Sequence, residues 1–124
     1  MSLIGIDLGS SAIKVAAYSI EGRLLASARR SVPATHNRDG HSEIDVRESR
    51  EAFDSALGEV AAHPELRRDP PIAVSFSSSG REVFPVGADG TPLGPCLMTA
   101  DLRGDEVASV TAGRRSPEEW FHVR

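Results

Sequence analysis

The sequence contains a single cysteine and few aromatic residues, and it has no long apolar run. Because Cys96 is the only cysteine among 124 residues, no disulfide can form within the chain, and a reducing cytoplasm is the expected location. No apolar stretch reaches the length of a signal-peptide core or a membrane span, so neither a targeting segment nor a membrane partner is expected. We expect Cys96 to be a partly buried thiol without a chemical role.

Acidic residues outnumber basic ones, with 18 Asp and Glu against 14 Lys and Arg and a net charge of −4. This balance gives no general affinity for polyanions, and we expect no nucleic-acid partner. The glycine patterns of P-loops and dinucleotide-binding turns are absent. The four histidines show no close ligand spacing with one another or with the cysteine, which disfavours a metal site built on them.

The chain is long enough for one domain, and its apolar pattern predicts strands in a definite order. Residues 2–7, 12–19 and 23–32 are expected to form three strands joined by tight turns, the first of them central and buried. Residues 33–44 are polar and predict a loop. Residues 72–76 predict a buried strand parallel to the first, reached by a helical crossover.

A helix is expected between these strands. Asp45 and Glu48 have the spacing of a capping box, and the pattern continues to about residue 63. Its apolar face at helical spacing comprises Val46, Phe53, Ala56, Leu57 and Val60. The other expected elements are a polar connection over 65–71, a strand over 82–86, a hairpin turn at 89–90, and helices over 101–112 and from 116.

The most informative run is the first strand, the turn and the start of the second strand. Gly9, Ser10 and Ser11 form a turn that offers backbone N–H groups and hydroxyls to a phosphate. Asp7, directly before the turn, is placed to hold a hydrated Mg²⁺ that bridges phosphate oxygens, and Lys14 adds a cation. The alternative is an ordinary hairpin with a solvated aspartate. The flanking strands and the lysine favour the phosphate site.

Four stretches in order resemble the FGGY family of carbohydrate kinases, within the actin-like ATPase superfamily. They are residues 5–14, 40–45, 73–82 and 89–95, the last of them followed by 101–103. The resemblance implies an α/β, ribonuclease H-like fold whose mixed sheet has three antiparallel strands, then parallel strands, with flanking helices. It also implies that ATP, with Mg²⁺, phosphorylates a sugar or polyol hydroxyl.

The same resemblance implies which residues face the sugar, namely Gly80, Arg81, Glu82, Asp101 and Arg103. Carboxylates accept hydrogen bonds from hydroxyls and arginine donates to carbonyl or ring oxygens. Two alternatives stay open: the Arg81–Glu82 pair could be an exposed cross-strand pair, and Asp101 could cap the helix that follows it. Thr99 stands where many family members have a tryptophan, which leaves the identity of the sugar open.

Family members contain two such domains, so the resemblance implies that residues 1–124 are the N-terminal part of the first one, with the second absent and no activity alone. The exposed end at Trp120 and Phe121 would then favour self-association into a homodimer. A non-catalytic actin-like module that serves as a partner-binding scaffold or regulator is the main alternative. An actin-like chaperone or filament fragment fits less well, and a nuclease is disfavoured because Asp7 is the only acid on its strand.

Overall fold

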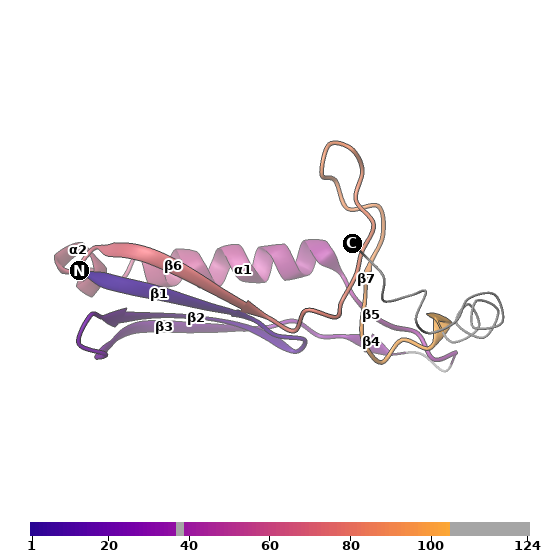
Figure 1. Ribbon diagram of the computed structural model, residues 1–124, viewed down its shortest axis with the longest axis horizontal. Coiled ribbons are helices and arrows are strands. Elements are labelled where there is room, and N and C mark those ends of the chain that lie inside the picture. Colours follow the sequence, from indigo (N-terminus) through magenta and orange to yellow (C-terminus); the bar gives the residue numbers. More distant parts are fainter. Residues whose placement is uncertain (37–38, 105–124) are drawn as a thin grey trace, which may run out of the picture.

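A four-stranded mixed sheet with one long helix on it forms the main body of the computed structural model, which describes residues 1–36 and 39–104 (Figure 1). The strands in spatial order are β3 (Leu24–Ser31), β2 (Ala12–Ser19), β1 (Ser2–Leu8) and β6 (Pro71–Ser78). β1 is antiparallel to β2 and parallel to β6, as the sequence predicts. Tight turns join the first three strands, and Gly22 in the second turn has a φ of 86° that favours glycine.

Helix α1 (Val46–Ala61) covers one face of this sheet over β2 and β3. The Asp45 side chain accepts hydrogen bonds from the backbone N–H groups of Arg47, at 2.7 Å, and Glu48, at 3.3 Å, so the predicted N-cap is confirmed. The inner face of α1 packs on the sheet through Ala56 and Val60, which are fully buried. The core beneath the helix consists mainly of small and β-branched side chains: Ile4, Ile6, Ile13, Val15, Ala17, Leu25, Ala26, Ala28, Val32, Ile44, Ala56, Val60 and Leu66.

β6 differs from its prediction. It is parallel to β1 as expected, but all eight of its residues are exposed, so the prediction of a buried strand was wrong. Within the described residues, β6 is an edge strand that pairs only with β1. Helix α1 packs mainly on β2 and β3, and it approaches β6 through Phe53 and Phe76, whose ring centroids are 6.5 Å apart. β1 is central as predicted, yet it is buried on one face only, since Leu3 is 42% exposed on the other.

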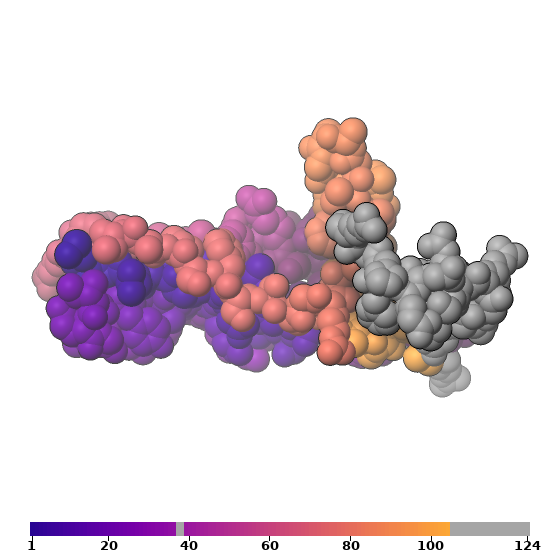
Figure 2. Space-filling model, in the orientation of Figure 1, coloured from indigo at the N-terminus to yellow at the C-terminus, as the bar shows by residue number. Residues whose placement is uncertain are grey.

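A second, smaller sheet lies at one end of the main sheet. Its strands are β4 (Thr35–His36), β5 (Ser42–Ile44) and β7 (Cys96–Leu97), so the predicted loop over 33–44 contains two short strands. The predicted strand over 82–86 is reduced to isolated bridges, Val83 to Leu97 and Val86 to Pro92. This segment projects from the body as a long hairpin with its turn at Asp89–Gly90, as Figure 2 shows in orange. A projecting hairpin has few neighbours to pair with, which explains the short bridges.

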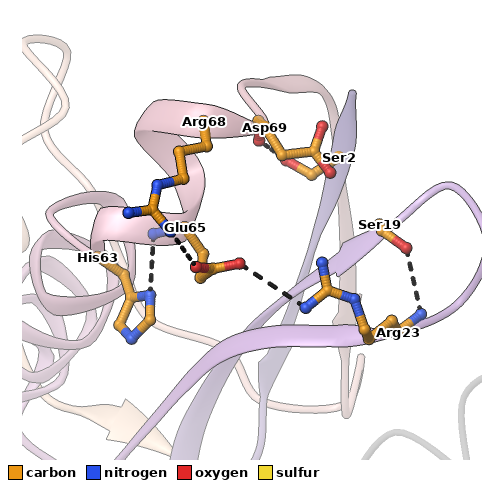
Figure 3. Close-up of polar contacts among 7 residues, drawn as sticks. All are labelled: Ser2, Ser19, Arg23, His63, Glu65, Arg68 and Asp69. Atoms are coloured by element: carbon orange, nitrogen blue, oxygen red, sulfur yellow. Dashed lines mark hydrogen bonds and ion pairs between the residues drawn. The ribbon is translucent and has the colours of Figure 1, made fainter.

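The opposite end of the sheet is closed by polar contacts of α2 (Pro64–Arg68), a short helix in the predicted polar connection (Figure 3). The Glu65 carboxylate contacts Arg23 of the turn between β2 and β3 at 3.7 Å and Arg68 at 3.3 Å. The hydroxyl of Ser2 donates to the carbonyl of Asp69 at 2.6 Å. These bonds fix the start of β1 and β6 at this end, and the candidate site lies at the other.

Several expectations fall on residues that the structure does not describe. Arg103 and Gly104 are helical, in line with the start of the helix predicted over 101–112, but the rest of it lies outside the described residues. The same holds for the helix predicted from residue 116 and for Trp120 and Phe121. No helix in the described part of the chain is both long and apolar enough to span a bilayer.

Candidate functional site

The predicted phosphate turn connects β1 and β2 at the end of the sheet opposite α2. The N–H of Gly9 donates to the carbonyl of Ala12 at 3.2 Å, and the carbonyl of Ser11 accepts from the N–H of Val32 at 3.0 Å. A Cβ atom on Gly9 would lie 2.9 Å from the Ala12 carbonyl oxygen, so only glycine fits without displacing backbone. Ser10 and Ser11 are exposed. The turn is therefore a closely held backbone loop that presents two hydroxyls to the solvent.

Asp7 and Lys14 lie opposite each other on neighbouring strands, on the sheet face that α1 does not cover. The Lys14 ammonium donates to Asp7 Oδ2 at 2.9 Å, and the two side chains are 57% and 44% exposed. Lys14 is the only lysine in the sequence. The structure thus brings together the acid and the cation that sequence reasoning selected, within reach of a ligand at the end of β1.

The donor set at Asp7 decides which kind of metal site is compatible with the chain. Among the described residues, no group of three or more His, Cys, Asp or Glu side chains converges. A direct protein cage for a metal is therefore not formed there, whereas a single exposed carboxylate fits Mg²⁺ that keeps most of its waters and is shared with phosphate oxygens. Asp7 fits the predicted water-mediated role.

The segment after β6 turns sharply and folds back on itself. Gly80 has a φ of 69°, and the hydroxyl of Ser79 donates to Glu82 Oε2. The N–H of Arg81 donates to the same oxygen at 3.2 Å. The Ser79 hydrogen bond is the main reason that the pKa of Glu82 lies below its usual range. Glu82 is consequently held as a carboxylate at the turn, while the Arg81 side chain is exposed.

Asp101 and Arg103 bind each other and thereby hold the last described segment against β5. Arg103 donates through Nε and through a terminal nitrogen to the two Asp101 oxygens, at 2.9 and 2.6 Å, and that terminal nitrogen is 2.6 Å from Glu43 Oε1. Asp101 Oδ2 accepts from the N–H of Ser42 at 2.8 Å. The hydrogen bond from Arg103 is the main reason that the pKa of Asp101 is low. The same bond is the main reason that the pKa of Arg103 is raised.

This arrangement bears on the two interpretations of Asp101. Its Oδ1 also accepts from the backbone N–H of Arg103 at 3.0 Å, which is the type of bond that a capping aspartate makes. Its side chain is only 5% exposed. Asp101 and Arg103 thus act as a latch between distant segments, and a direct contact of either with sugar stays a prediction.

Two adjoining hollows lie beside the phosphate turn, and both are lined by Ser10, Ser79 and Glu82. The first extends toward α1 and includes Gly9, Gly80 and Cys96, whose pKa is raised mainly by burial. The second has a volume of about 510 Å³, within the range of small-molecule sites. We call it the serine-lined cavity; its walls are Ser10, Ser11, Val32, Pro33, Ala34, His36, Ser42, Ser79, Glu82, Met98, Thr99 and Ala100.

Ser42 is a candidate that sequence reasoning did not select. It is 2% exposed, it lines the serine-lined cavity, and its hydroxyl has no hydrogen-bond partner among the described residues. A buried hydroxyl without a partner is costly, so Ser42 is a candidate for contact with a ligand at this wall. The sequence indicated a role for Ser42 only through its place in the stretch 40–45. Its burial could not be predicted locally, because Ser42 is held by backbone and side-chain bonds to Met98 and Asp101, far along the chain.

Comparisons with known proteins identify the family of the chain. The model of the N-terminal domain of the FGGY family of carbohydrate kinases matches residues 2–119. A probable L-xylulose kinase of Haemophilus influenzae is 27% identical over 84% of this chain and 21% of its own length. A xylulose kinase of Staphylococcus epidermidis is 30% identical over 82% of this chain and 20% of its own length.

Solved structures give the fold. The xylulose kinase of Rhodospirillum rubrum matches with a TM-score of 0.84 at 22% identity, over 96% of this chain and 24% of that one. Plasmodium falciparum glycerol kinase with ADP matches with a TM-score of 0.77 at 17% identity, over 95% of this chain and 24% of that one. The expected actin-like ATPase fold is therefore confirmed, and the chain spans about a fifth to a quarter of the length of these proteins.

Proposed function

The chain belongs to the FGGY family of carbohydrate kinases, and we propose that it forms the N-terminal, phosphate- and sugar-binding part of such a kinase. The reaction is transfer of the terminal phosphoryl group of ATP to a hydroxyl of a sugar or polyol, with Mg²⁺ as the metal. The observation that carries the proposal is the Ser10–Ser11 turn, which borders the serine-lined cavity and is separated from Asp7 only by Leu8 and Gly9. The single cysteine supports a cytoplasmic location.

In this proposal the phosphate turn binds and orients the phosphates. N–H groups and hydroxyls of Ser10 and Ser11 donate to phosphate oxygens, and Gly9 leaves room for their approach. Lys14 contributes positive charge next to Asp7, and the Asp7 carboxylate would hold hydrated Mg²⁺ through water molecules. The metal would supply positive charge that offsets the negative charge of the phosphates.

The acceptor occupies the serine-lined cavity. Glu82, next to Gly80 and Arg81, accepts hydrogen bonds from substrate hydroxyls, because its carboxylate is fixed by the turn and lines the cavity. Asp101 and Arg103 support the cavity wall through the latch to β5. Since phosphoryl transfer depends mainly on positioning and charge neutralisation, this division of roles suits the reaction.

The test is a sugar-dependent ADP-release assay on the natural gene product that contains these residues. Ketoses, aldoses and polyols are supplied with ATP and Mg²⁺, beginning with xylulose because several relatives are named for it. We expect at least one acceptor to stimulate ADP release and Asp7→Ala to remove that stimulation. Absence of stimulation by every acceptor, in a folded protein, contradicts the proposal and favours a partner-binding module.

A further inference from the structure

A row of polar side chains crosses the main sheet on the face that α1 does not cover. In this row Asp7 of β1 lies opposite Lys14 of β2. On the far side of Lys14, Arg29 of β3 is its partner in the antiparallel register. Ser77 of β6 extends the row on the other side of Asp7. One carboxylate and two cations therefore share one level of the sheet, close to the phosphate turn.

Arg29 belongs to this row, whereas its neighbour Arg30 does not, because successive residues of a strand point to opposite faces of a sheet. Arg30 reaches α1, where it donates to the Ser55 hydroxyl at 3.0 Å and pairs with Glu59. The Arg29 side chain is exposed on the other face, and it forms no ion pair or hydrogen bond with any residue in the ranges 1–36 and 39–104. The charge of Arg30 is thus used to hold α1 on the sheet, and that of Arg29 is not used by the described part of the chain.

Two cations that face each other across neighbouring strands are unfavourable by themselves. The Cβ atoms of directly opposed residues lie about 4.5–5.5 Å apart, and like charges in such positions destabilise a sheet. Asp7 accepts from the Lys14 ammonium at 2.9 Å and offsets one of the two charges, so the row keeps a net positive charge. Lysine and arginine side chains at this spacing are long enough to donate to one shared anion, and such an anion would remove the repulsion between them.

We infer that Arg29 is a second phosphate-binding cation, which binds the phosphate chain of the nucleotide together with Lys14. The inference rests on the proposed function and adds a residue to its phosphate site. The phosphate turn lies within reach, since Ser31, two positions beyond Arg29, pairs with Ala12, directly after the turn. A phosphate chain suits the row because it carries several negative charges and many acceptor oxygens, so that two cations bind it at once.

The experiment measures binding to the natural gene product by calorimetry, with Mg²⁺ and without an acceptor, so that the readout does not depend on catalysis. The ligands are a non-hydrolysable ATP analogue and AMP. Arg29→Gln should weaken binding of the ATP analogue at least about fivefold, because a charge-assisted hydrogen bond is lost, and should affect AMP much less. The affinity of this variant should also depend less steeply on salt concentration, since one screened charge contact is missing. Arg29→Lys, which keeps the charge, should retain more affinity than Arg29→Gln.

Arg67→Gln provides the matched control. Arg67 is likewise exposed, but it lies on α2 at the opposite end of the sheet, so its replacement should leave the affinity and its salt dependence as they are. Urea unfolding separates binding from structure. Arg29→Gln removes the repulsion from Lys14, so the urea midpoint should stay the same or rise. Should Arg29→Gln fail to fold, Arg29→Thr removes the same charge with a residue that is favoured in strands.

The outcomes distinguish this inference from the proposed function. Weaker binding of the ATP analogue and a shallower salt dependence in Arg29→Gln, with neither effect in Arg67→Gln, support the inference. Equal effects of the two variants overturn it, because net charge alone would explain them. Weaker binding with an unchanged salt dependence or a lower urea midpoint overturns it as well, since Arg29 would then act through the fold. Unchanged binding in Arg29→Gln also overturns it, and the phosphate site of the proposed function stands if Lys14→Gln still weakens binding. If the wild-type protein does not bind the ATP analogue, the proposed function fails and the inference fails with it.

Discussion

Replacing Asp7 with asparagine should separate the role of its carboxylate in catalysis from its role in stability. The change removes the charge that pairs with Lys14 at 2.9 Å but keeps the size of the side chain. Both side chains are about half exposed, at 44% and 57%. Exposed pairs of this kind contribute about 0.2–1 kcal/mol, so we expect the free energy of unfolding to fall by less than about 1 kcal/mol.

Activity should fall much further. If Asp7 positions water molecules on Mg²⁺, its amide variant loses an outer-sphere contact, and removal of such contacts typically costs about 10- to 100-fold in metal affinity or activity. The assay is kcat/KM for the acceptor over a range of Mg²⁺ concentrations, together with urea unfolding of the same preparation. We expect a raised Mg²⁺ requirement and a nearly unchanged urea midpoint.

Asp54→Asn provides the matched control. Asp54 pairs with Arg50 on α1 at 2.8 Å, and the two side chains are 53% and 72% exposed, so this pair resembles Asp7–Lys14 in geometry and exposure. It should cost the same small amount of stability and leave the Mg²⁺ dependence unchanged. The reasoning is refuted if both variants affect activity equally, or if Asp7→Asn retains the wild-type Mg²⁺ dependence.

Three further predictions concern the core, the turn and the latch. Val60→Ala should lower the free energy of unfolding by about 2–3 kcal/mol, because it removes two buried methyl groups and leaves a cavity. Val83 is 63% exposed, so Val83→Ala should change the free energy of unfolding by less than about 0.5 kcal/mol. Urea unfolding measures both variants. Gly9→Ala should weaken ATP binding, measured by calorimetry, because its Cβ would meet the Ala12 carbonyl oxygen at 2.9 Å; unchanged affinity would show that the turn is not the phosphate site. The pKa of Asp101 is lowered on folding, so its contribution to stability is present above the unfolded-state pKa of about 3.9 and is lost as the pH falls below that value. Asp101→Asn should therefore reduce the loss of unfolding free energy at acid pH. An unchanged pH dependence would contradict the role of Asp101 in the latch.

Features that depend on a few neighbouring residues could be predicted from the sequence. The N-cap at Asp45, the hairpin turn at Gly22 and the helix face that contains Val60 are all as expected. Each follows from local hydrogen bonding or from helical periodicity, which short windows of sequence carry. The pairing of Asp7 with Lys14 belongs here as well, because a tight turn between two antiparallel strands sets their register.

Features that depend on distant segments were harder to predict. The apolar run in β6 suggested burial, yet exposure is decided by which elements cover a strand, and α1 lies mainly over β2 and β3. The latch joins Ser42 and Asp101, which are 59 positions apart, and no local pattern signals such a pair. The short strand β5 likewise pairs with β7, which lies far along the chain.

The sequence by itself determined the chemistry that is available: a glycine–serine turn after an acid, one lysine, and a carboxylate beyond β6. It also determined the order of most strands along the chain, because turn residues and apolar periods are local properties of the sequence. Only the tertiary structure decided how these groups are used. It exposed the Asp7–Lys14 pair, turned Glu82 into the serine-lined cavity, and neutralised Arg103 with two carboxylates. Those outcomes depend on burial and charge pairing between segments that meet only when the chain is folded.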